Sequence, residues 1–287
     1  MWVIYAFISA FSETGKDVLG KSSATKTNVL VTAFSVQFFG LLFLMPLLIL
    51  TGIPLIKPNF WIGLLLAIFT IPTSQILYFR AVKLSPLSIS VPVLSINPIF
   101  TALLSWFFDK RLPDGLGWLG IIIICIGLYL SRLEKDVLRQ GIWSPLRSIF
   151  QDPGSLSMLG VAFIWSLGAH ISKMTVVASS PIFAAVSFFI LGSILLTLIG
   201  VFTRQFSLQL IQSQIGKLSL LGFFSGVSEL AMNCAMAIGF TPYVISIKRS
   251  NIVWSSLLGK LLYQEKLSFI KLIGIMLMFS GIVLLLL

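Results

Sequence analysis

Glu13 lies near the middle of an apolar run that extends from Trp2 to about Ser23. Such a run is long enough to cross a bilayer, and an unpaired carboxylate there costs at least a few kcal/mol. Lys21 follows eight residues later, a little over two helical turns, and projects from roughly the same helix face. We interpret Glu13 as a proton carrier that competes with substrate for one site, and Lys21 as a further substrate-binding residue. The alternative is that Glu13 only pairs with Lys16 or Lys21.

A second acid, Glu229, lies inside the apolar run 217–239, and Asn233 follows it by one helical turn. Residues four apart share a helix face, so both side chains would reach the same surroundings. The pattern predicts a second cavity acid that takes part in proton coupling, with Asn233 orienting the substrate. A hydrogen bond between helices is the alternative.

Basic residues also interrupt the later apolar runs. Lys173 and His170 fall in the run 156–176, and Lys248 and Arg249 interrupt the run 242–262. Ionisable groups at membrane depth are functional by default, so Lys173 and Lys248 are predicted to line a cavity. Lys248 would face an anionic group of the substrate. The alternatives are that Lys248 and Arg249 meet lipid phosphate or neutralise an acid, and that His170 is a hydrogen-bonded packing residue.

Weaker candidates for the cavity lining are polar or aromatic residues in apolar runs. They are Gln75, Tyr78, Asn97, Trp165, Asn251 and Trp254. A single histidine cannot build a histidine-based metal site, and no cysteine cluster offers another. No H-E-x-x-H, G-x-S-x-G or Walker A sequence is present, so we predict neither an enzyme nor a cofactor.

The composition predicts which solvent surrounds these residues. The chain of 287 residues is 57% hydrophobic and 10% charged, whereas a soluble domain is about 25% charged. The mean hydropathy is +1.03. The chain has a net charge of +11, and most of its basic residues lie between the apolar runs. This distribution favours contact with anionic lipid over contact with nucleic acid. The two cysteines, Cys125 and Cys234, lie in apolar runs and indicate packing residues.

Ten apolar runs are present, and each must be a helix because a bilayer offers the backbone no other partner. The runs are about 2–23, 30–50, 60–79, 86–107, 115–131, 156–176, 182–203, 217–239, 242–262 and 268–287. The predicted fold is an all-α polytopic membrane protein with ten transmembrane helices.

The two halves resemble each other in sequence. Segments that match in unchanged order are 33–40 with 185–192, 81–86 with 237–242, and 120–127 with 274–281. The first offset also pairs Lys21 with Lys173 and Glu13 with Trp165. Five spans per repeat force the second copy to be inverted, an arrangement that places transporter sites at the repeat interface. We therefore divide the chain into a first repeat (1–133), a linker (134–155) and a second repeat (156–287).

The chain resembles the drug/metabolite transporter superfamily in its ten-helix EamA-type form. The resemblance rests on Trp165-Ser166 followed by Lys173, on Glu265-Lys266-Leu267 before Gly274, and on the run 248–251 with Gly259. It implies a central cavity lined by helices 1, 3, 4, 6, 8 and 9, with helices 5 and 10 as packing elements. The spacing of Glu13 and Lys21 also resembles helix 1 of the small multidrug resistance proteins. EamA repeats commonly have Trp-Gly in helix 1, where this chain has Glu13-Thr14.

These observations predict a secondary active transporter, a proton-coupled exporter of small organic solutes such as amino acids, working by alternating access. The alternatives are an exporter of lipophilic cations, a sugar or phosphate metabolite exchanger, and a non-transporting sensor or scaffold. The expected location is a prokaryotic plasma membrane, with protons, lipids and a small substrate as partners. The chain would be a monomer or a homodimer through its glycine-rich helices 5 and 10.

The membrane orientation is left open by two conflicting signals. Odd-numbered connections carry most of the basic residues, which by the positive-inside rule places both termini outside. The family resemblance implies both termini in the cytoplasm.

Overall fold

The computed structural model describes residues 1–24, 29–85, 90–133, 141, 143–148, 151–204, 208–255, 258 and 268–287. Every regular element within these residues is a helix. The helices are α1 (Trp2–Ala24), α2 (Val29–Thr51), α3 (Pro58–Leu84), η1 (Val91–Ile96), α5 (Asn97–Phe108), α6 (Gly115–Arg132), α8 (Ser144–Ser148), α9 (Pro153–Val177), α10 (Pro181–Phe202), α11 (Leu208–Ser213), α12 (Ile215–Ile238), α13 (Thr241–Lys248) and α15 (Phe269–Leu286). The all-α prediction is therefore confirmed.

Within the described residues, seven helices are long and apolar enough to cross a membrane: α2, η1 continuing into α5, α6, α9, α10, α12 and α15. A shorter apolar helix covers Pro58–Ser74 within α3. The chain is an integral multi-pass membrane protein. α1 also has the length of a span, at 23 residues, but it carries four charged side chains. The count of ten spans stays a prediction.

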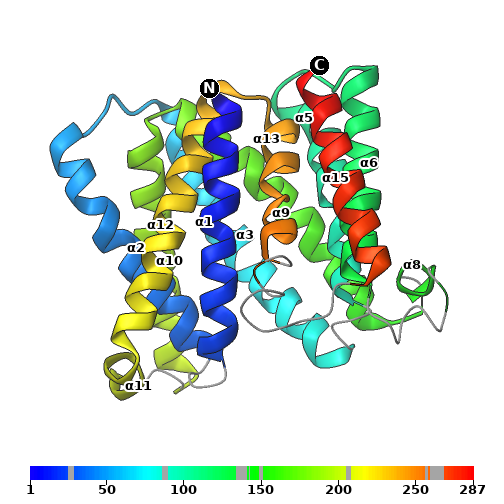
Figure 1. Ribbon diagram of the computed structural model, residues 1–287. Helices are drawn as coiled ribbons and strands as arrows, with labels where there is room; N and C mark the ends of the chain where they lie inside the picture. Colours follow the sequence, from blue (N-terminus) through cyan, green and yellow to red (C-terminus); the bar gives the residue numbers. More distant parts are fainter. Residues whose placement is uncertain are drawn as a thin grey trace.

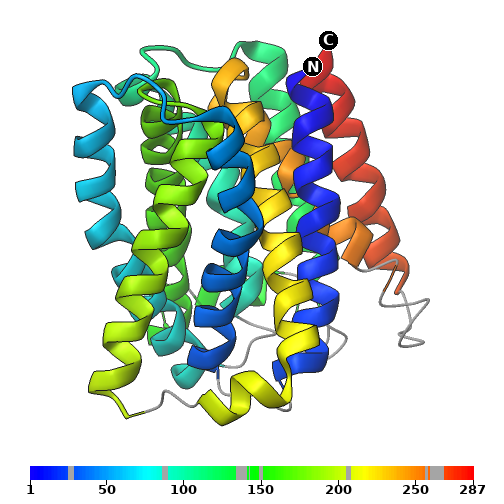
Figure 2. The same ribbon diagram turned by 90° about the vertical axis from the view of Figure 1, so that its left-hand side faces the viewer.

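The bundle has its two chain termini on one face, where α1 begins and α15 ends (Figure 1, Figure 2). We call this the termini face, and the other end of the bundle the opposite face. α12 ends at the termini face, because Gly239 packs beside Trp2 of α1. α6 begins there, because Gly120 packs against Leu285 of α15. These directions locate every other helix end.

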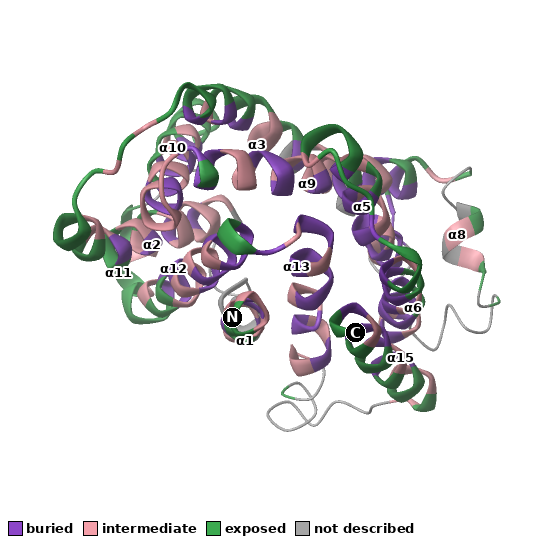
Figure 3. Cartoon of the chain, turned by 90° about the horizontal axis from the view of Figure 1, so that it is seen from above, coloured by how far each residue is buried: buried purple, intermediate pink, exposed green. Residues whose placement is uncertain are grey.

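The most extensive helix packing joins α6 with α15, α3 with α9, and α1 with α12. Each pair takes one helix from residues 1–133 and one from residues 152–287. Seen from the termini face, α13 lies at the centre, with α1 on one side and α6 and α15 on the other (Figure 3). The two parts of the chain therefore interlock.

Glycines bring α6 and α15 close together. A Cβ built on Gly127 would lie 2.6 Å from the Gly274 carbonyl oxygen, and one on Gly120 would lie 2.9 Å from the Gly281 carbonyl oxygen. Glycine permits this approach where a side chain would clash. The glycines expected in helices 5 and 10 thus pack against each other within one chain, and a homodimer contact stays a prediction.

Two of the predicted spans are not regular α-helices throughout. The predicted run 86–107 contains the 3-10 helix η1, and α5 begins only at Asn97. Pro92 and Pro98 lie in this stretch, and proline removes a backbone donor and crowds the preceding turn. α13 ends at Lys248, and a turn at Arg249 and Ser250 follows before the chain is helical again. Asn97, where η1 passes into α5, accepts a hydrogen bond from Arg249 in the turn that follows α13.

Candidate functional site

A cavity of about 400 Å³ lies between α1, α2, α3, α9, α12 and α13. Its charged lining residues are Glu13, Glu229, Lys248 and Arg249. Gln37, Thr70, Ser74, Ser172 and Asn251 add polar groups, and Trp165, Met232 and Ile245 add apolar walls. We call this cavity the charged chamber. It gathers both predicted acids and the predicted cation of α13 in one space.

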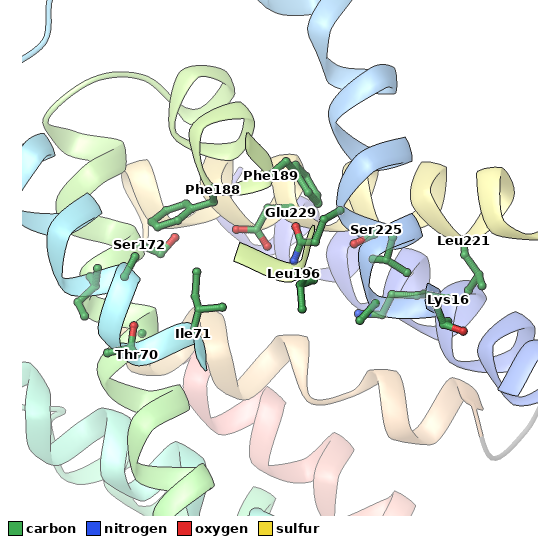
Figure 4. Close-up of a pocket in the computed structure, with 17 residues that line it drawn as sticks. Lys16, Thr70, Ile71, Ser172, Phe188, Phe189, Leu196, Leu221, Ser225 and Glu229 are labelled. Carbon is green, nitrogen blue, oxygen red and sulfur yellow. The ribbon is translucent and has the colours of Figure 1, made fainter. Parts of the chain in front are cut away.

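A second cavity of about 660 Å³ adjoins the charged chamber (Figure 4). The two have six lining residues in common: Gln37, Thr70, Ile71, Gly168, Ser172 and Glu229. This wide chamber extends along the helices toward the opposite face, where Lys16, Thr32, Leu196 and Leu221 line it. Phe188 and Phe189 of α10 form part of its wall. Glu229 is therefore at the junction of the two chambers.

Two side chains contact the Glu13 carboxylate among the residues that the structure describes. Its Oε1 atom forms an ion pair with Lys16, one turn further along α1. Its Oε2 atom accepts a hydrogen bond of 3.0 Å from the Ser228 hydroxyl of α12, and that hydroxyl also lies 3.1 Å from the Ser9 carbonyl oxygen. Lys248 lines the same chamber as Glu13. The pairing with Lys16 that the sequence offered as an alternative is thus present, within a cavity-lining position.

Glu229 and Lys248 differ from Glu13. Both side chains line the charged chamber and both are only half-buried. Among the residues that the structure describes, neither has an ion pair or a side-chain hydrogen bond. A carboxylate and an ammonium facing one cavity without such partners can each accept an ion of the opposite charge. The pair is the strongest candidate for a ligand site in this part of the chain.

Arg249 also lines the charged chamber, and its guanidinium is held from behind. Its Nη2 donates a 2.7 Å hydrogen bond to Asn97 Oδ1, and its Cζ lies 5.7 Å from the centroid of the Trp165 ring. Asn97 Nδ2 donates to Ser166 Oγ at 2.6 Å. Tyr78 stacks on Trp165 at 6.3 Å. Arg249 and Trp165 therefore form the chamber wall, and Asn97 and Tyr78 support them.

The remaining polar candidates of the second half lie in different places. Asn251 lines the charged chamber, and its carbonyl oxygen accepts a 3.1 Å hydrogen bond from Thr14. Asn233 is buried outside the lining. Its Oδ1 accepts a 3.1 Å hydrogen bond from the Ser172 hydroxyl, and its Nδ2 donates a 3.2 Å hydrogen bond to the Pro181 carbonyl oxygen. Trp254 packs between Phe11 and Phe279, also outside the lining. The side chains of Lys21 and Gln75 lie outside the described residues.

His170 and Lys173 do not line either chamber. The Lys173 ammonium lies 3.1 Å from Asp109 Oδ1, and His170 Nε2 lies 2.9 Å from the Thr101 carbonyl oxygen. The His170 ring stacks on Phe108 at 5.1 Å. The two residues belong to a cluster at the end of α5, and their role in substrate binding stays a prediction.

The sequence model of a known transporter family matches residues 1–133 and 152–287 of this chain. The chain belongs to the EamA-like transporter family. It is also 33% identical over 79 residues to the probable 4-amino-4-deoxy-L-arabinose-phosphoundecaprenol flippase subunit ArnE of Proteus mirabilis, a match that covers 28% of this chain and 68% of that protein. A solved structure titled only "Crystal structure of protein" superposes with a TM-score of 0.77 at 16% identity, covering 99% of this chain and 95% of that chain. At that identity the superposition shows a shared fold alone.

As a member of the EamA-like family, the chain is a membrane transporter. The resemblance implied a cavity lined by helices 1, 3, 4, 6, 8 and 9, which correspond to α1, α3, η1 with α5, α9, α12 and α13. Among the described residues α2 and α10 also line the wide chamber, through residues such as Gln37 and Phe188, whereas η1 and α5 contribute none. Asn97 of α5 reaches the site only through Arg249.

Sequence reasoning missed several lining residues of this EamA-family cavity. Thr70 and Ser74 of α3 and Gly168 and Ser172 of α9 all face it. In each pair the residues are four apart in an otherwise apolar helix, so both members share one face. That spacing was the available signal. No three His, Cys, Asp or Glu side chains gather to hold a metal within the described part of the chain.

Proposed function

We propose that this EamA-family transporter is a secondary active, proton-coupled exporter of small zwitterionic solutes such as amino acids, and that it works by alternating access. The observation that carries the proposal is the pair formed by Glu229 and Lys248. Both face the charged chamber without an ion-pair partner among the described residues. A substrate ammonium would bind at Glu229, and a substrate carboxylate would bind at Lys248.

The size and the walls of the cavity support a small solute. The two chambers, about 400 and 660 Å³, fall within the roughly 300–1,000 Å³ typical of small-molecule sites. Asn251 and Arg249 add polar groups beside Lys248, and Trp165 adds an aromatic wall. An apolar side chain on the solute would extend past Glu229 toward Phe188 and Phe189 in the wide chamber.

The helix pairing supports alternating access. In two five-helix repeats, α1 is equivalent to α9, α3 to α12 and α6 to α15. Exchanging the equivalent helices turns the α1–α12 contact into the α9–α3 contact and leaves the α6–α15 contact unchanged. This is the arrangement expected of two inverted repeats, 1–133 and 156–287, with the site at their interface. A movement of one repeat relative to the other would expose Glu229 and Lys248 first to one side of the membrane and then to the other.

The contacts of Glu13 support proton coupling. Its carboxylate balances Lys16 at the edge of the wide chamber and accepts from Ser228. Protonation of Glu13 would remove a negative charge beside Lys16 and so change the charge of the chamber that the substrate enters. Glu229 would bind either a proton or the substrate ammonium, which makes the two compete. Both acids thus keep the proton-coupling role proposed from the sequence.

A lipid-linked amine is the second candidate substrate. The relative from Proteus mirabilis is named as a probable flippase subunit for an amino sugar joined to a lipid through phosphate. Glu229 would suit the amine, and Lys248 with Arg249 would suit the phosphate. The aromatic wall at Phe188 and Phe189 would border the lipid.

Counterflow in proteoliposomes tests the proposal. The panel contains amino acids, sugar phosphates, lipophilic cations and an amino-sugar phospholipid, each with and without an imposed pH gradient. We expect saturable exchange of amino acids. Glu229→Gln and Lys248→Gln should each reduce it at least about thirtyfold, because losing one side of a buried charge contact costs about 2–5 kcal/mol. Glu13→Gln should abolish the response to the pH gradient and keep counterflow.

The matched control for this panel is Lys217→Gln, which neutralises an exposed lysine on α12 outside both chambers. Selective flipping of the amino-sugar lipid would favour the second candidate. Unchanged amino-acid exchange in Glu229→Gln and Lys248→Gln would refute the zwitterion site. No flux of any solute in the panel would favour a sensor or scaffold.

A further inference from the structure

A small polar cluster joins three helices at the termini face. Asp109 caps the C-terminal end of α5, and its Oδ1 lies 3.1 Å from the ammonium of Lys173 on α9. The same ammonium donates a 3.2 Å hydrogen bond to the carbonyl oxygen of Gly239, which caps the C-terminal end of α12. One lysine therefore links α9 to the ends of both α5 and α12.

The cluster lies between the charged chamber and the termini face. On α12, Met232 lines the chamber, and Gly239 follows two turns later toward that face. On α9, Ser172 lines the chamber, and Lys173 projects from the next position, one turn before the helix ends. The wide chamber extends in the other direction, toward the opposite face.

Further contacts close the same end of the bundle. Arg111 Cζ lies 5.0 Å from the centroid of the Phe240 ring, and the Tyr243 hydroxyl donates a 2.9 Å hydrogen bond to Asp114. Each contact joins the connection between α5 and α6 to the connection between α12 and α13 or to α13 itself. Asp109 lies at this end too: its Oδ1 lies 3.1 Å from the Lys173 ammonium and its Oδ2 lies 3.6 Å from His170 Nδ1.

The ion pair between Asp109 and Lys173 can open and re-form at a low cost in free energy. The Lys173 side chain is 21% exposed and the Asp109 side chain 13%. The desolvation of a pair buried to this extent offsets most of its attraction, so separating the ions into water costs little overall. Asp109 Oδ2 and the buried His170 Nδ1, 3.6 Å apart, have no hydrogen-bond partner among the described residues. A permanent structural contact normally satisfies such atoms.

We propose that Asp109, Lys173 and the Gly239 carbonyl form the gate that closes the charged chamber toward the termini face. The gate opens when Lys173 leaves Asp109 and Gly239, which separates the end of α5 from α9 and α12. The chamber then communicates with the termini face instead of the opposite face. This inference rests on the proposed function, because a gate has a purpose only in a protein that alternates its access.

Accessibility labelling tests the gate without a substrate. The background replaces Cys125 and Cys234 by serine, and Thr70→Cys places a reporter in the chamber wall. Lys57→Cys, exposed before α3, identifies the termini face in sealed vesicles of each orientation. The measured quantity is the rate at which a membrane-impermeant thiol reagent modifies the reporter from each side.

We expect Asp109→Asn and Lys173→Gln each to raise labelling from the termini face at least about fivefold, the lower end of typical conformational coupling. The exchange of charges in Asp109→Lys with Lys173→Asp rebuilds the ion pair but not the hydrogen bond to the Gly239 carbonyl oxygen, so we expect it to lower labelling only part of the way back toward the parent. Lys110→Gln removes an exposed charge next to Asp109 and serves as the control, with unchanged labelling expected.

Three results would overturn the gate. Labelling from the termini face does not change in either single variant, or rises equally from both sides, or is not lowered at all by the charge exchange. Thermal unfolding of the purified variants identifies misfolding, and in that case the charge exchange decides the outcome. Because this readout needs no transport, the gate can fail while amino-acid counterflow persists, and the reverse also holds.

Discussion

Ser228 donates a hydrogen bond of 3.0 Å to the Glu13 carboxylate, across the contact between α12 and α1. The same hydroxyl lies 3.1 Å from the Ser9 hydroxyl, so the two helices meet at a polar point inside an apolar bundle. A carboxylate at this depth requires such partners, and Lys16 supplies the second. The helix contact and the charge of the cavity therefore depend on each other.

Ser228→Ala should weaken both functions of this contact. We expect the variant to lower the free energy of unfolding by about 1 kcal/mol, the usual scale of a hydrogen bond between membrane helices. Proton-driven uptake should fall more than counterflow, because Glu13 loses an oriented donor. Ser219→Ala is the matched control, because Ser219 is a half-buried serine near the start of α12 whose hydroxyl donates within its own helix, to the Gly216 carbonyl oxygen. Equal loss of both transport modes would count against a coupling role for Glu13.

Gly127→Ala should destabilise the pair formed by α6 and α15. The added Cβ would lie 2.6 Å from the Gly274 carbonyl oxygen and 2.8 Å from the Met278 backbone nitrogen. Backbone atoms cannot move aside easily, so we expect a loss of about 1–3 kcal/mol in the free energy of unfolding. Gly216→Ala is the control, because nothing lies within 4 Å of its added Cβ. That variant should gain up to about 1 kcal/mol, and a neutral Gly127→Ala would contradict the close packing.

Asn97→Ala should act on substrate binding through Arg249. Asn97 Oδ1 accepts a 2.7 Å hydrogen bond from the guanidinium, which holds Arg249 in the chamber wall. We expect the KM for substrate to rise roughly tenfold, equivalent to about 1.4 kcal/mol, with a smaller change in kcat. Asn59→Ala, exposed on α3, is the control. A fall in kcat alone would place Asn97 in the conformational step.

Asp114 makes stability depend on acid pH. Its carboxylate accepts hydrogen bonds from the Gly117 backbone N–H and then from the Tyr243 hydroxyl, which lower its pKa below the usual value of 3.8. The folded state therefore binds this proton less readily than the unfolded state. The stabilisation is complete above the usual pKa and is lost as the pH falls through the lowered value. Thermal unfolding of the parent should show this decrease, and Asp114→Asn should lack that component. Identical acid profiles for the two proteins would contradict it.

The membrane class and the acids of the charged chamber could be predicted from the sequence, because both inferences depend only on the residue types along a single apolar run. An apolar run of about 20 residues must be a helix in lipid, and an acid within it must face a partner or a cavity. Glu13 and Glu229 followed from that rule alone, and both line the chamber. Lys248 followed from the same rule.

The position of Lys173 could not be predicted in the same way. Its ion-pair partner, Asp109, lies after the last residue of an apolar run and looks like an ordinary loop residue in the sequence. Only the packing of α5 against α9 brings the two side chains together. Thr70 and Ser172 were missed for a related reason, because small hydroxyl residues satisfy their own helix backbone and are common at any depth.

The most direct test of the central claim compares three ligands of one shape on three proteins. The ligands are a zwitterionic amino acid that the counterflow panel identifies, its amide, which lacks the negative charge, and its deaminated acid, which lacks the ammonium. Ligand-induced rise in melting temperature is measured for the parent, Glu229→Gln and Lys248→Gln. The account predicts that the zwitterion stabilises the parent most. The amide should stabilise Glu229→Gln less than the parent and Lys248→Gln as much as the parent. The deaminated acid should stabilise Lys248→Gln less than the parent and Glu229→Gln as much as the parent. Equal stabilisation of all three proteins by the zwitterion would contradict the assignment of Glu229 and Lys248 as the two ends of the binding site.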